Sequence, residues 1–445
     1  MAENFHETII LGAGISGLSC GYFLKSHDLL ILEAEKRVGG KFLSQRKDDL
    51  LLENGPNALL LRTNEVKDLL IELGLDGRII FPARKTQKRY ICKGNLMVEV
   101  NPLSLIFTLT DLHSKFKLIT GGFSRKAKKE NESINEFFSR KISPYFAKNL
   151  IVPLVSGIYA GNTSKLIMKS AFPMIHQWDK TYNSLLLGAV KYMLGRKGHP
   201  IKSGICSFPE GMEEVTQKLA EKLKGKIKLN TPVKSVKKTK KHWVIETDKK
   251  KYHCNNLITT MPAPQFRKVL TGKQFTQLKD KLKKIYYPWL TLCHFVYRKE
   301  DVKNRSRGFG FLCTQDKKRE QLGCLFPSHM FPGRVEDGKE VFTIFVGGSL
   351  YPEKAKLAKA KLYALVHDEL ATILDIRTRE PERVIAYEWK ESIPQYDKNQ
   401  FAFKKWCEEN KPEKENLHFC TNYWGGISTS DCVSTAKTLA EKLMQ

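Results

Sequence analysis

The sequence lacks any apolar run long enough to cross a bilayer. A spanning helix needs roughly 18 or more apolar residues, and the longest candidate, NLIVPLVSGIYAG, is interrupted by Pro153 and Gly157. The opening MAENFHE also lacks the basic and apolar regions of a secretory signal peptide. We therefore expect a cytoplasmic protein that is neither exported nor membrane-spanning, although it could still bind peripherally to the inner face of the cell membrane.

Paired cysteines are missing as well. The ten cysteines include no C-x-x-C pair and no histidine at the spacing of a zinc site. We therefore expect buried free thiols in a reducing compartment, and no metal. Internal repeats and low-complexity tracts are also absent, which argues against a solenoid and against disordered linkers.

Charge is abundant but unevenly distributed. The chain has 75 Lys and Arg against 47 Asp and Glu, a net charge of +28, whereas residues 1–80 hold 9 basic and 12 acidic residues. Clusters such as RKAKK (125–129) and KKTKK (237–241) suit an anionic partner, which would be a membrane surface, a nucleic acid or a polycarboxylate ligand. A lysine-rich solvated surface is the structural alternative. No nucleic-acid-binding module accompanies the clusters, so we do not expect a nucleic-acid partner.

The hydrophobic pattern indicates an α/β fold. Short β-branched runs alternate with amphipathic stretches, which is typical of strands and helices in turn. A first strand, helix and second strand are predicted over 7–11, 15–26 and 29–33. The rest of the chain divides into a helix-like, aromatic and basic region at about 100–200, an α/β region at 206–260 and a strand-rich region at 285–350.

The stretch GAGISG has the spacing of a dinucleotide-binding loop. Gly12 permits the tight turn, Gly14 lets a pyrophosphate approach the backbone, and Gly17 allows the helix to pack on the strand. The anion would lie at the helix N-terminus. Glu33 ends the next strand, where a carboxylate can accept hydrogen bonds from ribose hydroxyls. A purely structural turn is the alternative. The predicted contacts of this region are Gly12, Ala13, Gly14, Ile15, Ser16, Gly17, Glu33 and Ala34.

Further glycine loops favour FAD over NAD, because the longer flavin requires more main-chain contacts. One follows the acidic strand end in EAEKRVGGKF, and another lies in LENGPNALL. In NYWGGISTSD, two glycines precede the last helix, whose N-terminus would face the edge of the flavin where reduction builds negative charge. The predicted contacts in the first two loops are Arg37, Gly39, Gly40, Lys41, Gly55, Pro56, Asn57 and Ala58.

With these motifs the chain resembles the FAD-dependent amine oxidase superfamily and, within it, the oxygen-dependent protoporphyrinogen/coproporphyrinogen oxidase family. GAGISGL, LEAEKRVGGK and ENGP mark the superfamily; VSGIYAGNTSKLIMKSAFP, SFPEGMEEV, LGCLFPSHMFPGR and NYWGGISTSDC mark the narrower family. The resemblance covers nearly the whole chain. It implies a discontinuous Rossmann-type FAD-binding domain, a mainly antiparallel β substrate domain and an inserted α-helical, membrane-associating domain. The implied segments are 1–91, 206–260 and 386–445 for FAD binding, 92–205 for the insertion and 261–385 for substrate.

The resemblance also implies the reaction. A porphyrinogen would be oxidised to the porphyrin for haem biosynthesis, with FAD as cofactor, O2 as acceptor and hydrogen peroxide released. Protoporphyrinogen IX is the expected substrate; coproporphyrinogen III, with four propionates instead of two, is the alternative. A more distant alternative is a flavin amine oxidase, in which Tyr423 and Trp424 would form an aromatic cage. The implied partners are an anionic membrane surface, a second copy of the chain and the next haem-pathway enzyme.

Site residues follow from the same resemblance. Arg89 would grip a propionate in two parallel hydrogen bonds. The apolar walls of the substrate site are expected from Gly157, Phe309, Gly310, Leu312, Leu325 and Phe345. These residues could equally be sheet core. Further FAD contacts are implied at Val233, Trp389, Gly426, Ile427 and Ser428. No general base emerges, and no catalytic residue is assigned, because the candidate histidines lie in unrelated contexts: His113, His176, His294 and His329.

Overall fold

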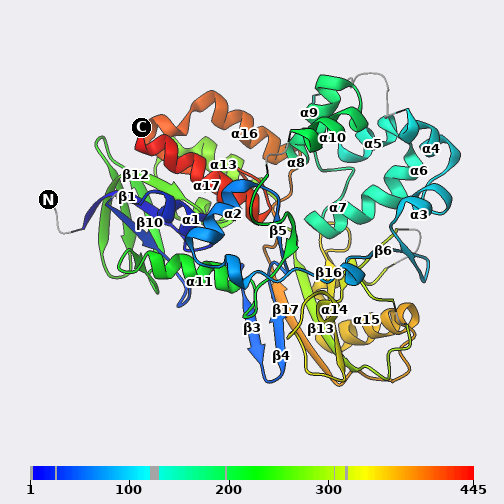
Figure 1. Cartoon of the computed structure of the whole chain (residues 1–445). Helices are drawn as coiled ribbons and strands as arrows, with labels where there is room; N and C mark the ends of the chain where they lie inside the picture. Colours follow the sequence, from blue (N-terminus) through cyan, green and yellow to red (C-terminus); the bar gives the residue numbers. More distant parts are fainter. Residues whose placement is uncertain (1–3, 26–27, 121–129, 196–197, 305, 316–318) are drawn as a thin grey trace.

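The computed structural model forms three lobes (Figure 1). It describes residues 4–25, 28–120, 130–195, 198–304, 306–315 and 319–445. One lobe holds a mixed sheet and both ends of the chain, a second is helical, and a third holds a larger, mainly antiparallel sheet. The chain therefore has the mixed α/β fold that the sequence predicts.

The first sheet is parallel around a buried central strand. β1 (Phe5–Leu11) lies between β12 (Lys251–Thr259) and β2 (Leu29–Leu32), and both pairings are parallel. Ile9, Ile10 and Leu11 are completely buried, as expected for a parallel strand covered on both faces. Beyond β12 lie β11 (Trp243–Thr247) and then β10 (Val233–Lys238); β9 (Ile227–Lys228) lies beyond β2, and β18 (Leu417–Phe419) pairs with β12.

Helices from distant parts of the chain cover this sheet. α1 (Ile15–Phe23) follows β1 directly and packs against α11 and α17, which come much later in the sequence. Their apolar faces share one core with Leu18, Leu219 and Ala436, all completely buried. The helices of this lobe are α2 (Asn64–Glu72), α11 (Glu213–Lys222), α12 (Ala263–Val269), α13 (Thr276–Lys283), α16 (Lys398–Asn410) and α17 (Thr429–Met444).

The second sheet has the strand order β17-β13-β16-β15-β14-β6-β7. Every pairing is antiparallel except β14 with β6, which is parallel. The strands are β6 (Arg89–Lys93), β7 (Leu96–Glu99), β13 (Leu290–Arg298), β14 (Gly310–Cys313), β15 (Gly323–Leu325), β16 (Lys339–Gly347) and β17 (Arg383–Trp389). The expected segment boundaries at 91 and 385 fall within β6 and β17, so each divides a strand of this sheet; the division of the chain into those segments stays a prediction.

One face of the second sheet is sealed and the other is half-open. α15 (Lys359–Leu374) packs on the sealed face, where Phe311, Phe342 and Ile344 are almost wholly buried. A hairpin of β3 (Ser44–Lys47) and β4 (Leu50–Glu53) joins the two lobes, since Leu52 packs against Val296. The hairpin thus covers part of the opposite face, on which Leu312, Leu325 and Phe345 keep partial exposure. The other short elements are β5 (Leu59–Leu61), β8 (Gly204–Cys206) and α14 (Pro327–Met330).

The region between 100 and 195 is helical, as the sequence predicts. Aromatic residues hold it together, with Phe137 packed edge-on against Phe138 at 5.2 Å. None of its described helices, nor any in the described remainder of the chain, is long and apolar enough to cross a membrane. The basic cluster 125–129 lies outside the described residues. The helices are α3 (Pro102–Phe107), α4 (Leu112–Ile119), α5 (Ile134–Lys141), α6 (Pro144–Phe146), α7 (Val152–Tyr159), α8 (Met168–Ala171), α9 (Pro173–Tyr182) and α10 (Leu185–Leu194).

Candidate active site

The first glycine loop joins β1 to α1 and leaves room for a ligand. Gly12 has φ +106°, and a Cβ on Gly17 would lie only 2.0 Å from the Gly12 carbonyl oxygen. A Cβ on Gly14 would meet nothing closer than the Cα of Gly40 at 4.0 Å. α1 begins at Ile15, and no side chain in the described structure caps its N-terminus at Gly14. An open backbone cradle at an uncapped helix N-terminus fits a diphosphate.

Glu33 lies beside this loop, directly after β2. Its carboxylate accepts hydrogen bonds from the backbone N–H of Ala13 (2.7 Å) and from that of Glu35 (2.9 Å). The carboxylate is thereby fixed next to the diphosphate cradle, where a dinucleotide places a ribose. The exposed Ala34 is next to it in the chain.

The second glycine loop rests directly on the first. The N–H of Gly39 donates to the carbonyl of Ala13 (2.8 Å), and a Cβ on Gly40 would lie 3.2 Å from the Cα of Gly14. Arg37 does not point away from the loop. Its guanidinium donates to the carbonyl of Phe42 (2.9 Å) and to that of Gly40 (2.5 Å), so it braces the loop from within.

Lys41 fastens the second loop to a distant segment. Its ammonium donates to the carbonyl oxygens of Glu391 (2.7 Å) and Ser392. It also lies 5.7 Å from the ring centre of Tyr287 and 5.9 Å from that of Trp389. Burial lowers the pKa of Lys41 to about 8. The predicted cofactor contacts Lys41 and Trp389 are thus neighbours.

The third glycine loop completes a continuous backbone surface. A Cβ on Gly55 would lie 1.8 Å from the carbonyl oxygen of Lys41, so only glycine fits there. The side-chain amide of Asn57 donates to the carbonyl of Gly55 (3.2 Å) and folds the loop back on itself. Pro56 and Ala58, also predicted contacts, are half-buried in the same loop. The structure therefore brings all three predicted loops together.

A buried histidine supports the third loop, and its role is not evident from the sequence. His294 lies between Asn54 (Nε2 to Oδ1, 3.1 Å) and Thr343 (Nδ1 to Oγ1, 2.9 Å). Complete burial lowers its pKa to about 4, so the ring is neutral at pH 7. The indole N–H of Trp389 donates to the carbonyl of Asn54 (2.5 Å). The only sequence signal is that Asn54 immediately precedes the glycine of ENGP.

The C-terminal glycine region leads into a capped helix. The N-terminus of α17 is already capped, because the N–H of Asp431 donates to the Ser428 hydroxyl (3.1 Å) and the Ser428 N–H to the Asp431 carboxylate (3.3 Å). Asp431 also pairs with Arg62 (2.8 Å). The helix end is thus partly satisfied by its own side chains, and the contacts of Gly426, Ile427 and Ser428 with the cofactor stay a prediction. Gly426 (φ +133°) turns the chain into this cap, and Ile427 packs against the helical lobe.

Val233 lies at the other end of the predicted cofactor set. It begins β10 and is half-buried beside the core that contains Trp243. Among the described contacts, Val233 makes no hydrogen bond to the glycine loops. Its contact with the cofactor stays a prediction.

The predicted substrate residues occupy neighbouring strands of the second sheet. Arg89 on β6 is the register partner of Gly310 on β14, and Gly310 is the partner of Leu325 on β15. The Arg89 guanidinium lies 5.8 Å from the ring centre of Phe309. Two residues along β14, Leu312 pairs across Gly323 with Phe345. The exposed cation of Arg89 is therefore aligned with an apolar strip, which consists of Leu312, Leu325 and Phe345.

This strip lies on the half-open face of the sheet. Leu312, Leu325 and Phe345 keep partial solvent exposure, whereas their chain neighbours Phe311 and Ile344 are buried under α15. The alternation assigns the strip to the face opposite α15. These predicted wall residues are therefore not part of the sealed sheet core.

Helix α7 approaches the strip at Gly157. A Cβ on Gly157 would lie 2.5 Å from Cδ2 of Leu312, so the predicted helical and sheet walls touch at this point. Leu154 and Ile158 on the same helix are each 42% exposed. Apolar side chains of α7 therefore remain exposed on the helix that contacts the strip.

The aromatic pair of the amine oxidase alternative does not form an open cage. Tyr423 is completely buried, with Phe403 at 5.6 Å and Phe419 at 6.3 Å between ring centres. Trp424 packs on the same two phenylalanines, and the Lys404 ammonium lies 5.8 Å from its ring centre. Both rings therefore belong to the core of the first lobe.

The described residues contain no cluster of three or more His, Cys, Asp or Glu side chains that could hold a metal ion. His329 lies 2.9 Å from Arg307 and 3.3 Å from Glu340. It belongs to a local ion-pair group on the second sheet.

The chain is similar to known proteins along nearly its whole length. The chain is 29% identical to protoporphyrinogen oxidase 2 of Arabidopsis thaliana, over 97% of this chain and 92% of the relative. It is 25% identical to coproporphyrinogen III oxidase of Bacillus subtilis, over 98% and 97%. A crystal structure from Exiguobacterium sp. 255-15, provisionally named a protoporphyrinogen oxidase, has a TM-score of 0.80 at 21% identity and covers 100% of both chains. Residues 15–444 match the model of the Flavin containing amine oxidoreductase family, so the chain belongs to this family of FAD-dependent oxidases.

Proposed function

We propose that this protein oxidises protoporphyrinogen IX to protoporphyrin IX, with O2 as the final electron acceptor, as a step of haem biosynthesis. Relatives named as protoporphyrinogen and coproporphyrinogen III oxidases support the porphyrinogen class. When bound, FAD would accept hydride equivalents from the substrate and pass the electrons to O2, releasing hydrogen peroxide. The residues of the three glycine loops would hold it.

The observation that carries this proposal is the alignment of Arg89 with the apolar strip. A porphyrinogen is a large apolar macrocycle with carboxylates at one edge, so it needs apolar walls and a cationic anchor. Arg89 lies level with Gly310 and Leu325, and Phe345 continues the strip. The guanidinium would hold a propionate while the strip and α7 enclose the ring.

The pairing of nearby cations favours the substrate with two propionates. Lys88 beside Arg89 is already bound to Glu99 (2.9 Å), and Arg307 interacts with Glu340 (3.4 Å). Each of these cations is partly neutralised, which leaves Arg89 as the better-placed anchor. Coproporphyrinogen III carries four propionates and would require more unpaired cations at the rim.

The decisive experiment compares the two porphyrinogens. Purified holoenzyme is given protoporphyrinogen IX or coproporphyrinogen III in air, and porphyrin fluorescence and peroxide are recorded. We expect a higher kcat/KM for protoporphyrinogen IX, with three peroxides released per porphyrin. A higher value for coproporphyrinogen III would reverse the assignment, and oxidation of neither would reject the proposed function.

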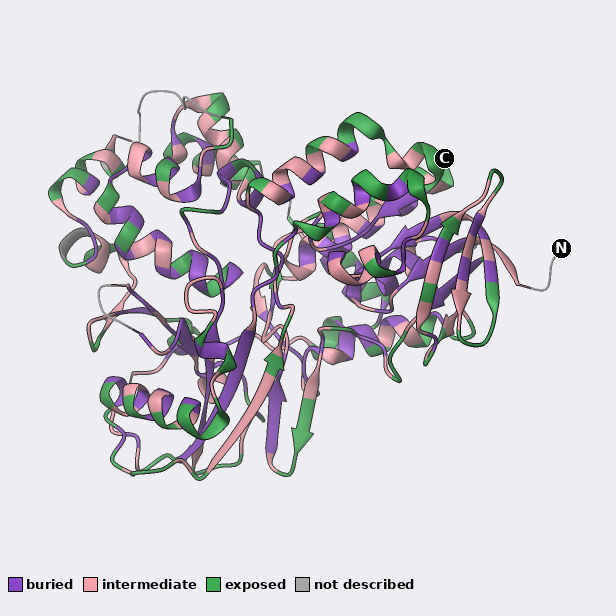
Figure 2. Cartoon of the chain, turned by 180° about the vertical axis from the view of Figure 1, so that it is seen from behind, coloured by how far each residue is buried: buried purple, intermediate pink, exposed green. Residues whose placement is uncertain are grey.

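Contact of the helical lobe with an anionic membrane surface is part of the same proposal. Exposed residues are spread over this lobe (Figure 2). In this lobe and on the neighbouring β7 they include large apolar side chains, which suits insertion into the headgroup region. They include Leu96, Leu103, Leu112, Phe116, Met174, Leu186, Leu187, Met193 and Leu194.

Sedimentation with vesicles tests this contact. Leu112 and Phe116 on α4 are 82% and 63% exposed, so replacing both with Gln removes apolar area without opening a core. We expect the parent protein to sediment with vesicles of anionic phospholipid at low salt, and the double variant to sediment less. Met444→Gln, at an exposed position on the far lobe, is the matched control. Parent protein that stays in the supernatant would contradict the proposal.

A further inference from the structure

Two cysteines are direct neighbours on adjacent strands. Cys92 on β6 and Cys313 on β14 are register partners in the parallel pair, with 0% and 3% exposure. Adjacent strands lie about 4.8 Å apart, and disulfides join Cα atoms about 4.4–6.8 Å apart. The backbone therefore places the two sulfurs within reach of a covalent bond.

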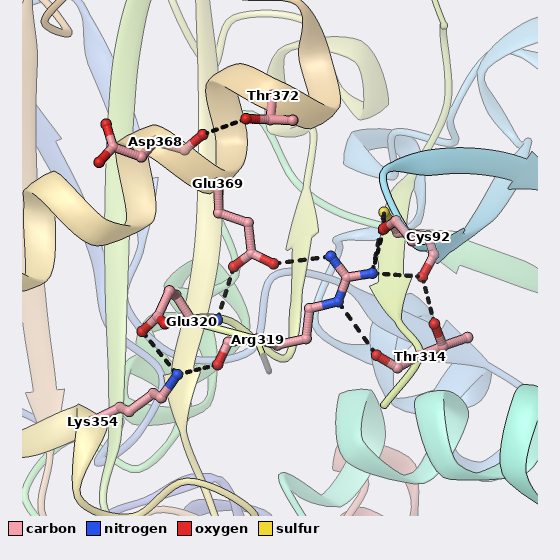
Figure 3. Close-up of polar contacts among 9 residues, drawn as sticks. Cys92, Thr314, Arg319, Glu320, Lys354, Asp368, Glu369 and Thr372 are labelled. Atoms are coloured by element: carbon pink, nitrogen blue, oxygen red, sulfur yellow. Dashed lines mark hydrogen bonds and ion pairs between the residues drawn. The ribbon is translucent and has the colours of Figure 1, made fainter. Parts of the chain in front are cut away.

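A buried arginine, Arg319, lies against Cys92 (Figure 3). Nη2 of Arg319 is 4.0 Å from the sulfur of Cys92 and donates to the Cys92 carbonyl (3.4 Å), while Glu369 holds the guanidinium at 3.0 Å. A hydrogen bond with Cys313, and then the charge of Arg319, lower the pKa of the Cys92 thiol. The same hydrogen bond and burial raise the pKa of Cys313. When protonated, the Cys92 thiol donates to the carbonyl of Gly94 (3.3 Å).

Three other buried cysteines have a different environment. Burial raises the pKa of Cys206, Cys254 and Cys293 to about 12 in each case. Thiolates, not thiols, react with oxidants and disulfides. Cys92 is thus the reactive member of its pair, and Cys313 is placed to resolve its oxidised form.

We propose that Cys92 and Cys313 form a reversible thiol–disulfide pair that is oxidised by a peroxide. The Cys92 thiolate attacks a peroxide oxygen, the O–O bond breaks, and a sulfenic acid and a hydroxide form; the proton that the Cys92 thiol released on ionisation converts the hydroxide to one water. The sulfur of Cys313 then attacks the sulfenic sulfur; the S–S bond forms, the S–O bond breaks, and a second water leaves. Two thiols lose two electrons and two protons, and hydrogen peroxide is reduced to two waters.

The proposed function would supply the oxidant, hydrogen peroxide. The inference rests on the proposed function only for this source of peroxide. Each two-electron oxidation of substrate would release one hydrogen peroxide, a molecule small enough to reach a buried thiol during brief opening of the fold. The pair lies on β6 and β14, the strands that carry Arg89 and Gly310. Peroxide would therefore act on the sheet that binds the substrate.

The disulfide would be easily reduced, and its formation would shift Arg89 and so change substrate binding. Side chains on neighbouring parallel strands stand farther apart than the roughly 3.5–4.5 Å between the Cβ atoms of a relaxed disulfide. Closure must pull β6 towards β14, and strained disulfides are the labile ones. Because Arg89 is three residues before Cys92 on the same strand, we expect the oxidised protein to show a several-fold higher KM with a smaller change in kcat.

Peptide mapping tests the pair without reference to the substrate. Holoenzyme is treated with hydrogen peroxide, unfolded in an alkylating reagent and digested without reductant. We expect a peptide linking Cys92 to Cys313 that dithiothreitol removes, while Cys254, the matched buried control, is fully alkylated. Alkylation of both Cys92 and Cys313 after peroxide treatment would overturn the proposal, as would oxidation of Cys92 to the sulfinic acid in place of the disulfide.

Single variants identify the order of the steps. Cys313→Ser should accumulate a Cys92 sulfenic acid that reacts with dimedone, whereas Cys92→Ser should leave Cys313 alkylatable. The reverse pattern would overturn the assigned roles. During turnover in air, the disulfide should form and catalase should prevent it. If the disulfide forms with added peroxide but not during turnover, the proposed thiol pair stands. That outcome would count against the proposed function as the source of the peroxide.

Discussion

The imidazole Nε2 of His294, in the second sheet, lies 3.1 Å from the amide oxygen of Asn54, in a loop of the first lobe. His294 is completely buried and its other nitrogen contacts Thr343 at 2.9 Å. Asn54 precedes Gly55, and its carbonyl accepts from Trp389. This contact therefore joins the sheet of the proposed substrate site to the glycine loops of the proposed cofactor site.

Replacing His294 with Gln should change how stability depends on pH. The folded pKa of about 4 lies below the ordinary value of 6.5, so the unfolded chain binds the proton and stability falls as pH drops through this window. At pH 5 the cost is about 2 kcal/mol relative to pH 7.5, from 1.36 kcal/mol per pKa unit. Urea unfolding at both pH values should show a smaller loss for His294→Gln.

The control for this measurement is His113→Gln, at an exposed position on α4. It should lose as much stability between pH 7.5 and pH 5 as the parent does. An equal pH response in His294→Gln and the parent would show that His294 is not the group responsible.

Gly14→Ala should weaken FAD binding without unfolding the protein. Its added methyl meets no protein atom closer than 4.0 Å, so the fold should persist, but it would occupy the cradle proposed for the diphosphate. A steric cost of about 1–3 kcal/mol predicts FAD affinity weakened by about tenfold or more. Fluorescence titration of the apoprotein with FAD measures this. Gly17→Ala is the contrast, because its Cβ would lie 2.0 Å from the Gly12 carbonyl and should destabilise the fold itself.

Arg89→Ala should raise KM far more than it lowers kcat, because the guanidinium is proposed to bind a propionate away from the reacting atoms. Loss of a charge-assisted hydrogen bond, about 1.5–3 kcal/mol, corresponds to roughly a 10- to 100-fold higher KM. Arg89→Lys should recover part of the effect. Lys88→Ala removes an adjacent cation that is paired with Glu99, so it should change KM little. Equal KM values for Arg89→Ala and the parent protein would remove Arg89 from the site.

Local sequence patterns predict the glycine loops well because each requirement is local. Gly12 needs a positive φ, Gly17 needs the space beside the Gly12 carbonyl, and Glu33 follows the next strand. These constraints act within a single strand–helix–strand unit. The spacing of the residues is therefore enough to place the loop and the carboxylate together.

Roles that depend on distant partners could not be read from the sequence. Arg37 looks like a ligand-binding cation in its motif, but its guanidinium braces its own loop and lies 3.5 Å from the carboxylate of Glu213 on α11. His294 has no motif, and its partner Asn54 belongs to another lobe. β6 joins the second sheet only because it pairs in parallel with β14, far along the chain. Each of these contacts exists only once the tertiary fold has formed.

The contact between Gly157 and Leu312 gives the sharpest test of the proposed substrate site between α7 and the second sheet. A Cβ at Gly157 would lie 2.5 Å from Cδ2 of Leu312, the far end of a flexible side chain. Gly157→Ala should therefore push Leu312 away from α7 at little cost to stability, within about 1 kcal/mol. Because Leu312 lines the apolar strip, its displacement should raise the porphyrinogen KM several-fold.

A second substitution should relieve this effect, which a general loss of folding could not. Leu312→Ala removes the atom that clashes, so the double variant Gly157→Ala/Leu312→Ala should have a lower KM than Gly157→Ala alone, with a coupling energy of about 0.5–3 kcal/mol. Gly77→Ala is the matched control, since its Cβ would meet nothing within 4 Å. Strictly additive effects of the two substitutions on KM would mean that α7 and β14 do not enclose the substrate together.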